Sequence, residues 1–191
     1  TYKINAQVPN NMTLGGGGAL EFSGTISQVS FLGDSLNPTL IRYAPGQYYG
    51  FYTTATSTIP QNGGFPRTPY NFLQLDSATD IRVRHIHANG NKDSMNIGGH
   101  NGSDTYQIGA SGLCITNSAQ HISIEHCSFD GFCLDGILLL STNSLAEPPT
   151  DIDIKNTHCS TNGRNGISPC SSHDLVIRQC SFKDNATGDF W

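Results

Sequence analysis

The sequence predicts an all-β solenoid, in which short strands stack coil upon coil around one core, and three observations lead to this class. A nine-residue segment recurs four times along the chain. Within each copy, apolar or small residues occupy the second, fourth, seventh and ninth positions, and this alternation is typical of a strand. Clusters of Gly, Asn, Asp and Ser separate the segments, as turns require. The copies are Asp80–Ala88, His121–Phe129, Asp151–Cys159 and Asp174–Phe182.

A shorter segment precedes each copy, so that one coil consists of a strand, a turn, a bent strand and a second turn. These segments are Phe72–Leu75, Leu113–Thr116, Ile137–Leu140 and Gly166–Pro169. The copies start 41, 30 and 23 residues apart, and we interpret the shortest spacing as the bare coil. A single coil cannot bury its inner face, so equivalent apolar positions are expected to stack about 4.8 Å apart. The two predicted central columns are Ile81, Ile122, Ile152 and Leu175, and Val83, Ile124, Ile154 and Ile177.

Two phrases between the strands, Leu134-Asp-Gly-Ile137 and Arg164-Asn-Gly-Ile167, resemble the right-handed parallel β-helix repeats of the pectin-lyase-like superfamily. The opening, Val8–Gly18, is similar to the first coil of such proteins. The resemblance covers most of the chain and implies a single-stranded right-handed parallel β-helix. From the strand pattern we expect about six coils in one domain over residues 1–191, which we interpret as a fragment of a longer protein.

The catalytic motifs of the enzymes with this fold are missing from the sequence. Polygalacturonases carry Asn-Thr-Asp, Gly-Asp-Asp and Gly-His-Gly, and none of these occurs here. The Asp-Pro-His signature of alginate epimerases and the Trp-Ile-Asp-His run of pectate lyases are absent as well. The resemblance therefore implies a fold and a polysaccharide ligand, but it transfers no catalytic residue.

Composition narrows the classes of partner and cofactor. Only 13% of the 191 residues are charged and the formal net charge is −5, so the basic stripe of a nucleic-acid-binding protein is not expected. No apolar run approaches membrane-spanning length. The six cysteines are predicted to be buried thiols, because several fall in interior columns and Cys127 and Cys133 lack zinc-ligand spacing. We expect no cofactor and no metal, since His85 lies at the strand bend while His87 points outward.

Two insertions, near residues 45–70 and 89–110, interrupt the repeat and are expected on one flank of the solenoid. The first insertion is rich in tyrosine, and the second contains His100 in a Gly- and Asn-rich background. A tyrosine ring has an apolar face and a polar tip, which suits a sugar ring. The alternative is that these rings pack the loop against the solenoid. The predicted substrate-binding residues are Tyr48, Tyr49, Tyr52 and His100.

The outward positions of the bent strand supply the candidate catalytic residues, which are Glu125, Asp153, Lys155 and Arg84. Glu125 and Asp153 lie one coil and two residues apart, which places them roughly 8 Å from each other. That separation fits an inverting glycosidase, in which one carboxyl protonates the leaving group and the other activates water. In a lyase, Lys155 or Arg84 would neutralise a uronate carboxylate. The alternative is that these residues form a solvent-exposed ladder of alternating charges.

Two functions from different classes therefore follow from the sequence. The first is an extracellular polysaccharide-recognising β-helix, including a glycan-cleaving hydrolase, a lyase or a tailspike-type depolymerase. The second is a non-catalytic structural or adhesive β-helix, such as a fibre shaft or a surface binding module. The expected partners are a polysaccharide and other copies of the chain, through the ends or sides of the β-helix. We expect a location outside the cell or on a virion or cell surface.

Overall fold

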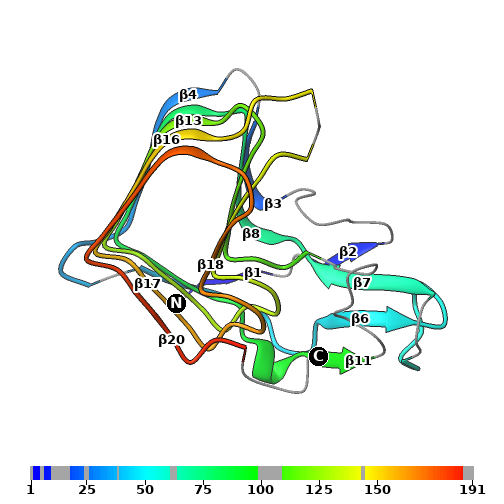
Figure 1. The fold of residues 1–191 in the computed structure, drawn as a ribbon. Helices are drawn as coiled ribbons and strands as arrows, with labels where there is room; N and C mark the ends of the chain where they lie inside the picture. Colours follow the sequence, from blue (N-terminus) through cyan, green and yellow to red (C-terminus); the bar gives the residue numbers. More distant parts are fainter. Residues whose placement is uncertain are drawn as a thin grey trace.

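The computed structural model is a right-handed parallel β-helix, which confirms the fold class predicted from the sequence (Figure 1). The structure describes residues 2–4, 7–9, 18–23, 26–37, 39–60, 64–98, 109–142 and 145–186. Those residues form five complete coils, each with one strand in each of three parallel sheets, and the additional strand β1 beside the first coil. The strand pattern of the sequence had suggested about six coils.

The three sheets are named in the order in which each coil crosses them. The first contains β3 (Gly18–Ser23), β8 (Asn71–Asp76), β12 (Leu113–Thr116), β15 (Ile137–Leu140) and β18 (Ile167–Pro169). The second contains β4 (Ser27–Leu32), β9 (Thr79–Arg84), β13 (Gln120–Glu125), β16 (Thr150–Lys155) and β19 (His173–Arg178). The third contains β1 (Tyr2–Ile4), β5 (Thr39–Tyr43), β10 (Ile86–Asn89), β14 (Ser128–Asp130), β17 (His158–Ser160) and β20 (Ser181–Lys183).

The inward columns stack in the register that the repeat predicts. Ile124 of β13 is the partner of Val83 on one side and of Ile154 on the other, and all three side chains are 0% exposed. Ile177 continues the column in β19, where it is 40% exposed because this coil ends the described stack. Each inward residue is thus covered by its equivalents above and below, and the stack itself forms the core.

Left-handed backbone recurs at two positions of the bent strands, at the first in all five coils and at the second in four of them, and the alternation of the sequence does not reveal it. The first position has φ between 50° and 58° in all five coils: Gln28, Asp80, His121, Asp151 and Asp174. The residues on either side of it pair in register, so this residue is left out of the ladder. At the corner between the second and third sheets, His85, His126, Asn156 and Gln179 have φ between 48° and 55°. Asp, Asn and His tolerate this conformation better than most residues, which accounts for their recurrence here.

The phrases that carried the resemblance hold neighbouring coils together through a buried ion pair. Asp135 is 0% exposed, and its Oδ1 accepts hydrogen bonds from Arg164 Nε at 2.9 Å and from the backbone N–H of Asn165 at 3.0 Å. Its Oδ2 lies 2.5 Å from Arg164 Nη2. The bidentate geometry satisfies a carboxylate that would otherwise be buried without a counter-charge.

The two insertions meet in a small sheet on one flank of the β-helix (Figure 1). This side sheet has the order β11 (Asn96–Gly98), β6 (Tyr48–Tyr52), β7 (Phe65–Pro69) and β2 (Gln7–Pro9), and η1 (Lys92–Ser94) precedes β11. β11 pairs parallel to β6, whereas β6 and β7 are antiparallel. Tyr49 and Phe51 pack with Ala110 and Cys133 in a second apolar cluster. The insertions therefore share a core of their own.

All six cysteines are free thiols, and four of them are buried, as predicted: Cys114, Cys127, Cys133 and Cys159. Burial raises the pKa of the Cys127 thiol to about 11, and it raises those of the other three buried thiols as well. The prediction of burial was wrong for Cys170, which is exposed, and for Cys180, which is half-buried because its coil ends the described stack. In the part of the chain that the structure describes, no helix is long and apolar enough to cross a membrane.

Candidate functional site

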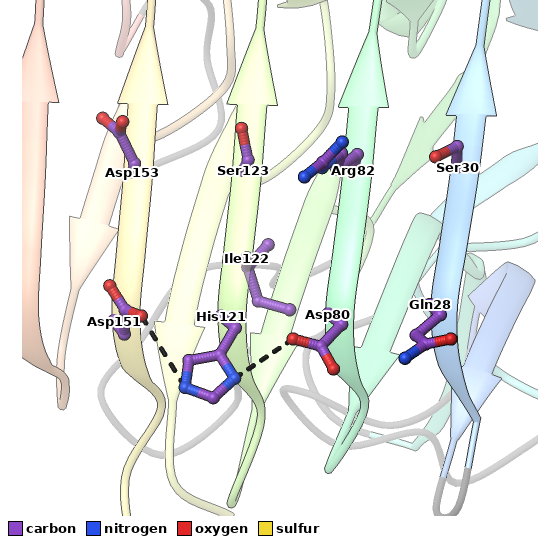
Figure 2. A pocket seen from close by; sticks show the side chains of 9 residues that line it. All are labelled: Gln28, Ser30, Asp80, Arg82, His121, Ile122, Ser123, Asp151 and Asp153. Atoms are coloured by element: carbon purple, nitrogen blue, oxygen red, sulfur yellow. Dashed lines mark hydrogen bonds and ion pairs between the residues drawn. The ribbon is translucent and has the colours of Figure 1, made fainter.

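A polar groove of about 580 Å³ crosses the outer face of the second sheet, over the strands β4, β9, β13 and β16. Figure 2 shows its side chains in two rows that run from coil to coil. The lower row is Gln28, Asp80, His121 and Asp151, and the upper row is Ser30, Arg82, Ser123 and Asp153. Since strands of a sheet lie about 4.8 Å apart, each row repeats a polar group at that spacing. We call this surface the outer groove.

In the lower row, the imidazole of His121 lies between two aspartates of the neighbouring coils (Figure 2). Its Nδ1 is 3.2 Å from Asp80 Oδ1, and its Nε2 is 3.8 Å from Asp151 Oδ2. The ring is 54% exposed, so water and a ligand can both reach it. The left-handed backbone at these three positions turns the side chains outward into one row. Each ring nitrogen of His121 therefore faces a carboxylate oxygen, of Asp80 on one side and of Asp151 on the other.

In the upper row, Asp153 has one oxygen paired and one oxygen without a partner. Its Oδ2 is 2.5 Å from Arg178 Nη2, in the next coil. Its Oδ1 is buried, and no hydrogen-bond donor for it is found within the described ranges. Buried carboxylate oxygens are normally satisfied, so this carboxylate has fewer hydrogen-bond partners than is usual.

The four predicted catalytic residues lie close together on the second sheet, but only Asp153 lines the outer groove. The predicted register is observed, because Glu125 is the partner of both Arg84 and Lys155. Glu125 forms an ion pair with Arg84 at 3.3 Å, and Asp153 forms its pair with Arg178. Each of the two carboxylates is thus paired with an arginine of a neighbouring coil.

The predicted substrate-binding tyrosines lie in the side sheet, away from the outer groove. Tyr49 and Tyr52 are each 1% exposed, so their rings pack the insertion and offer no face to a sugar. Burial raises the pKa of Tyr52 to about 12. Tyr48 is half-buried, and the guanidinium of Arg67 lies 3.5 Å from the centre of its ring. His100 lies outside the described residues.

Sequence reasoning missed the lower row of the groove. The signal was present, because the first position of every copy is Asp or His, although an alternating pattern alone does not say where such a residue points. Gln28 and Ser30 were missed for a different reason: their coil lacks a matching nine-residue copy, since residues 33–38 separate β4 from β5.

The outer groove is acidic and rich in groups that exchange hydrogen bonds. Its lining contains three carboxylates, of Asp80, Asp151 and Asp153, against the single arginine Arg82 and the imidazole of His121. Among the described residues, no group of three or more His, Cys, Asp or Glu side chains is placed to hold a metal ion. The carboxylate, hydroxyl and guanidinium groups of the lining can exchange hydrogen bonds with a hydroxyl-rich ligand, and an imidazole such as that of His121 can transfer a proton.

Comparison with known proteins identifies a fold family. A family model described as a right handed beta helix region matches residues 69–190, which is more than half of the chain. No curated protein and no solved structure matches the chain. The matched region contains four coils and six of the eight residues in the two rows of the outer groove, while Gln28 and Ser30 precede it.

Proposed function

This chain belongs to the right-handed β-helix family, and from that fold and the outer groove we propose that it recognises a polysaccharide. The observation that carries the proposal is the upper row of the outer groove, in which Ser30, Arg82, Ser123 and Asp153 present hydrogen-bonding groups from four successive coils. A sugar hydroxyl both donates and accepts hydrogen bonds, so it suits this mixture of hydroxyl, guanidinium and carboxylate groups. A chain of sugars lying across the coils would therefore meet polar groups at each strand.

The charge of the groove indicates a neutral glycan. Three carboxylates against one arginine and one histidine would repel the carboxylates of a polyuronate chain. A lyase of the kind described above acts beside a uronate carboxylate, so this balance favours hydrolysis over elimination where cleavage occurs. We also propose a location outside the cell or on a virion or cell surface, where polysaccharides of this kind are met.

The test of recognition is binding of neutral and uronate polysaccharides by the purified chain and by two variants. Asp153→Ala removes the unpaired acceptor, and we expect it to weaken binding of a neutral polysaccharide by about tenfold or more. Lys155→Ala is the matched control, because Lys155 lies two residues further along the same strand and outside the groove lining. Thermal unfolding of both variants checks that each is folded.

The glycan affinities of the two variants show whether the ligand binds in the outer groove or beside it. Weaker binding by Asp153→Ala alone supports the groove. Equal affinity of Asp153→Ala and the parent contradicts the assignment, and weaker binding by Lys155→Ala alone moves the site to the neighbouring column. Tighter binding of a polyuronate than of any neutral glycan would contradict the charge argument.

A second candidate function, hydrolysis of the bound glycan, is favoured by the row of Asp80, His121 and Asp151. Glycosidic hydrolysis needs one group that protonates the leaving oxygen and another that accepts a proton from water. We propose that Asp80 and Asp151, on either side of His121 in the same row, orient the imidazole, and that His121 exchanges the proton. Exposure of His121 leaves room for a reacting water beside Nε2.

The substitution His121→Asn tests this second function, because asparagine also tolerates the backbone φ of 54° at this position. We expect new reducing ends with the parent and a loss of at least about a hundredfold with the variant, at unchanged glycan affinity. Unchanged turnover would contradict the role of His121. Binding without any turnover by the parent would instead assign the chain to the non-catalytic binding modules.

A further inference from the structure

A second cleft, of about 450 Å³, lies at the corner where the second sheet passes into the third. It contains four of the seven histidines of the chain, and they come from three successive coils. Its lining is Ser35, His85, His87, His126, Cys127, Asn156 and His158. No carboxylate appears in that lining, in contrast to the outer groove. We call this surface the histidine cleft.

The histidines form two pairs that the stacking of coils creates. The rings of His85 and His126 are stacked, with centroids 5.2 Å apart and an angle of 12° between their planes. His87 meets His158 edge to face at 6.2 Å and 86°. His85 and His126 belong to the left-handed corner positions, which turn their rings outward. The same corner position carries Asn156 in the next coil.

The charged neighbours of these rings lie at the edges of the cleft. Asp130 Oδ2 is 3.4 Å from His158 Nε2, and Asp130 also accepts hydrogen bonds from the N–H and hydroxyl groups of Ser160. Asp34 interacts electrostatically with His85. Beside the stacked rings, Arg84 and Glu125 form an ion pair that is neutral as a unit.

The two carboxylates that act on these imidazoles, of Asp34 and Asp130, lie outside the cleft lining. Burial lowers the pKa of His87 and the neighbouring His158 lowers it further, whereas Asp130 raises it. His87 therefore remains neutral to a lower pH than an isolated histidine, while its charged form would add to the positive charge of the same cleft.

We propose that the histidine cleft binds an oxyanion, such as a sulfate or carboxylate group on a ligand, when the pH falls below neutrality. Two protonated rings about 5 Å apart repel each other, and an anion at the ring edges, where the nitrogens of the stacked rings lie side by side, offsets that repulsion with two attractions. Protonation also makes every ring nitrogen a donor, and the Ser35 hydroxyl adds a donor at the rim. The Asn156 amide nitrogen lies 3.4 Å from His126 Nε2, and protonation of that nitrogen would release the amide to donate elsewhere. Binding and protonation are linked, so each promotes the other.

A metal ion is a poorer occupant of this cleft. Within the described ranges, no group of three or more ligand side chains is placed to hold a metal. Stacked parallel rings direct their nitrogens side by side, whereas ligands of one metal converge on a point. Histidine protonation would oppose metal binding, and it would favour anion binding. The two occupants therefore predict opposite dependence on pH.

The test follows the imidazole resonances of the whole chain by nuclear magnetic resonance during titration with sodium sulfate and, separately, sodium glucuronate. Ionic strength is held constant with sodium chloride and a chelator is present. We expect sulfate to shift the resonances of the cleft histidines, with an affinity at about pH 5.5 at least tenfold higher than at about pH 7.5. The glucuronate titration distinguishes a sulfate-selective cleft from one that accepts any oxyanion.

Two substitutions localise the effect. His126→Asn keeps the left-handed corner, since Asn156 occupies the same position one coil further on, and we expect it to weaken sulfate binding at least about fivefold. His173→Asn removes an exposed histidine outside the cleft and is expected to leave the affinity unchanged.

The result that would overturn the proposal is an affinity that is the same at both pH values, or one that rises with pH. Equal weakening by the two variants, or binding only after zinc is added, would overturn it too. Loss of sulfate binding leaves the glycan experiments on the outer groove unaffected, because the two clefts have no lining residue in common.

Discussion

Ile124 and Ile177 occupy the same inward column, but the first is 0% exposed and the second is 40% exposed. Replacing each with alanine therefore measures what coverage by a neighbouring coil contributes to stability. The substitution removes three carbon atoms, which corresponds to about 2.4 kcal/mol of transfer free energy at 0.8 kcal/mol per methylene. At Ile124 a cavity remains between two coils, and the loss is expected to reach about 3.5 kcal/mol.

At Ile177 only 60% of the side chain is buried, since 40% is exposed, so the transfer part falls to about 1.4 kcal/mol. The open side of the last described coil leaves no enclosed cavity. We thus expect Ile124→Ala to cost about 2 kcal/mol more than Ile177→Ala. Equilibrium unfolding in urea, followed by far-ultraviolet circular dichroism, gives the two free energies of unfolding.

Equal losses for the two variants would refute the reasoning, because the column positions would then be energetically equivalent in spite of their different burial. A larger loss for Ile177→Ala would do so as well. A low-urea transition confined to the Ile177 variant would show that the last coil unfolds separately, as nearest-neighbour stability in a solenoid allows.

Three further predictions concern the buried ion pair and the buried thiols. Asp135→Asn leaves Arg164 without its counter-charge, so we expect a loss of about 3 kcal/mol in the free energy of unfolding, measured by urea denaturation. Alkylation at pH 8 should modify Cys170 first and leave Cys127 unmodified in the native state, which mass spectrometry of the digested protein will show. The raised thiol pKa values mean that the native state holds protons that the unfolded state releases. Stability should therefore decline as the pH rises from about 9 to 11, and thermal unfolding at a series of pH values measures this; a midpoint that does not fall in this range would contradict it.

The inward columns of β9, β13, β16 and β19 in the second sheet were predictable residue by residue, because two constraints act on the same positions. The alternation says which side chains point inward, and the repeat says which inward positions are equivalent. Parallel strands in register then leave a single way of stacking, so that Ile124 has to meet Val83 and Ile154. The diagonal neighbours Glu125 and Asp153 followed from the same register.

The sequence pattern did not predict the outward row, the packing of the insertion or the ion-pair partners, and each failure has a physical reason. Alternation assigns the direction of a side chain only where the backbone is extended. It therefore could not predict the outward row of Asp80, His121 and Asp151, whose backbone is left-handed. Aromatic residues in a long insertion suit a ligand or a small core equally well, and the burial of Tyr49 and Tyr52 decides for the core. The choice of ion-pair partner was also open, since Glu125 has a cation on each side and pairs with Arg84.

The same backbone requirement that shapes the fold also selects the chemistry of its surface. Left-handed positions in the second sheet favour short polar side chains such as Asp, Asn and His, because these tolerate the conformation. Those side chains are also the ones that carry protons and accept hydrogen bonds from sugars. A row of them thus arises along the stack for structural reasons, and function can be acquired by changing one residue of the row, such as His121 among the aspartates, without disturbing the core. We therefore expect the binding and proton-exchanging residues of such a β-helix at its repeated left-handed positions, because the residues of the inward columns form the core.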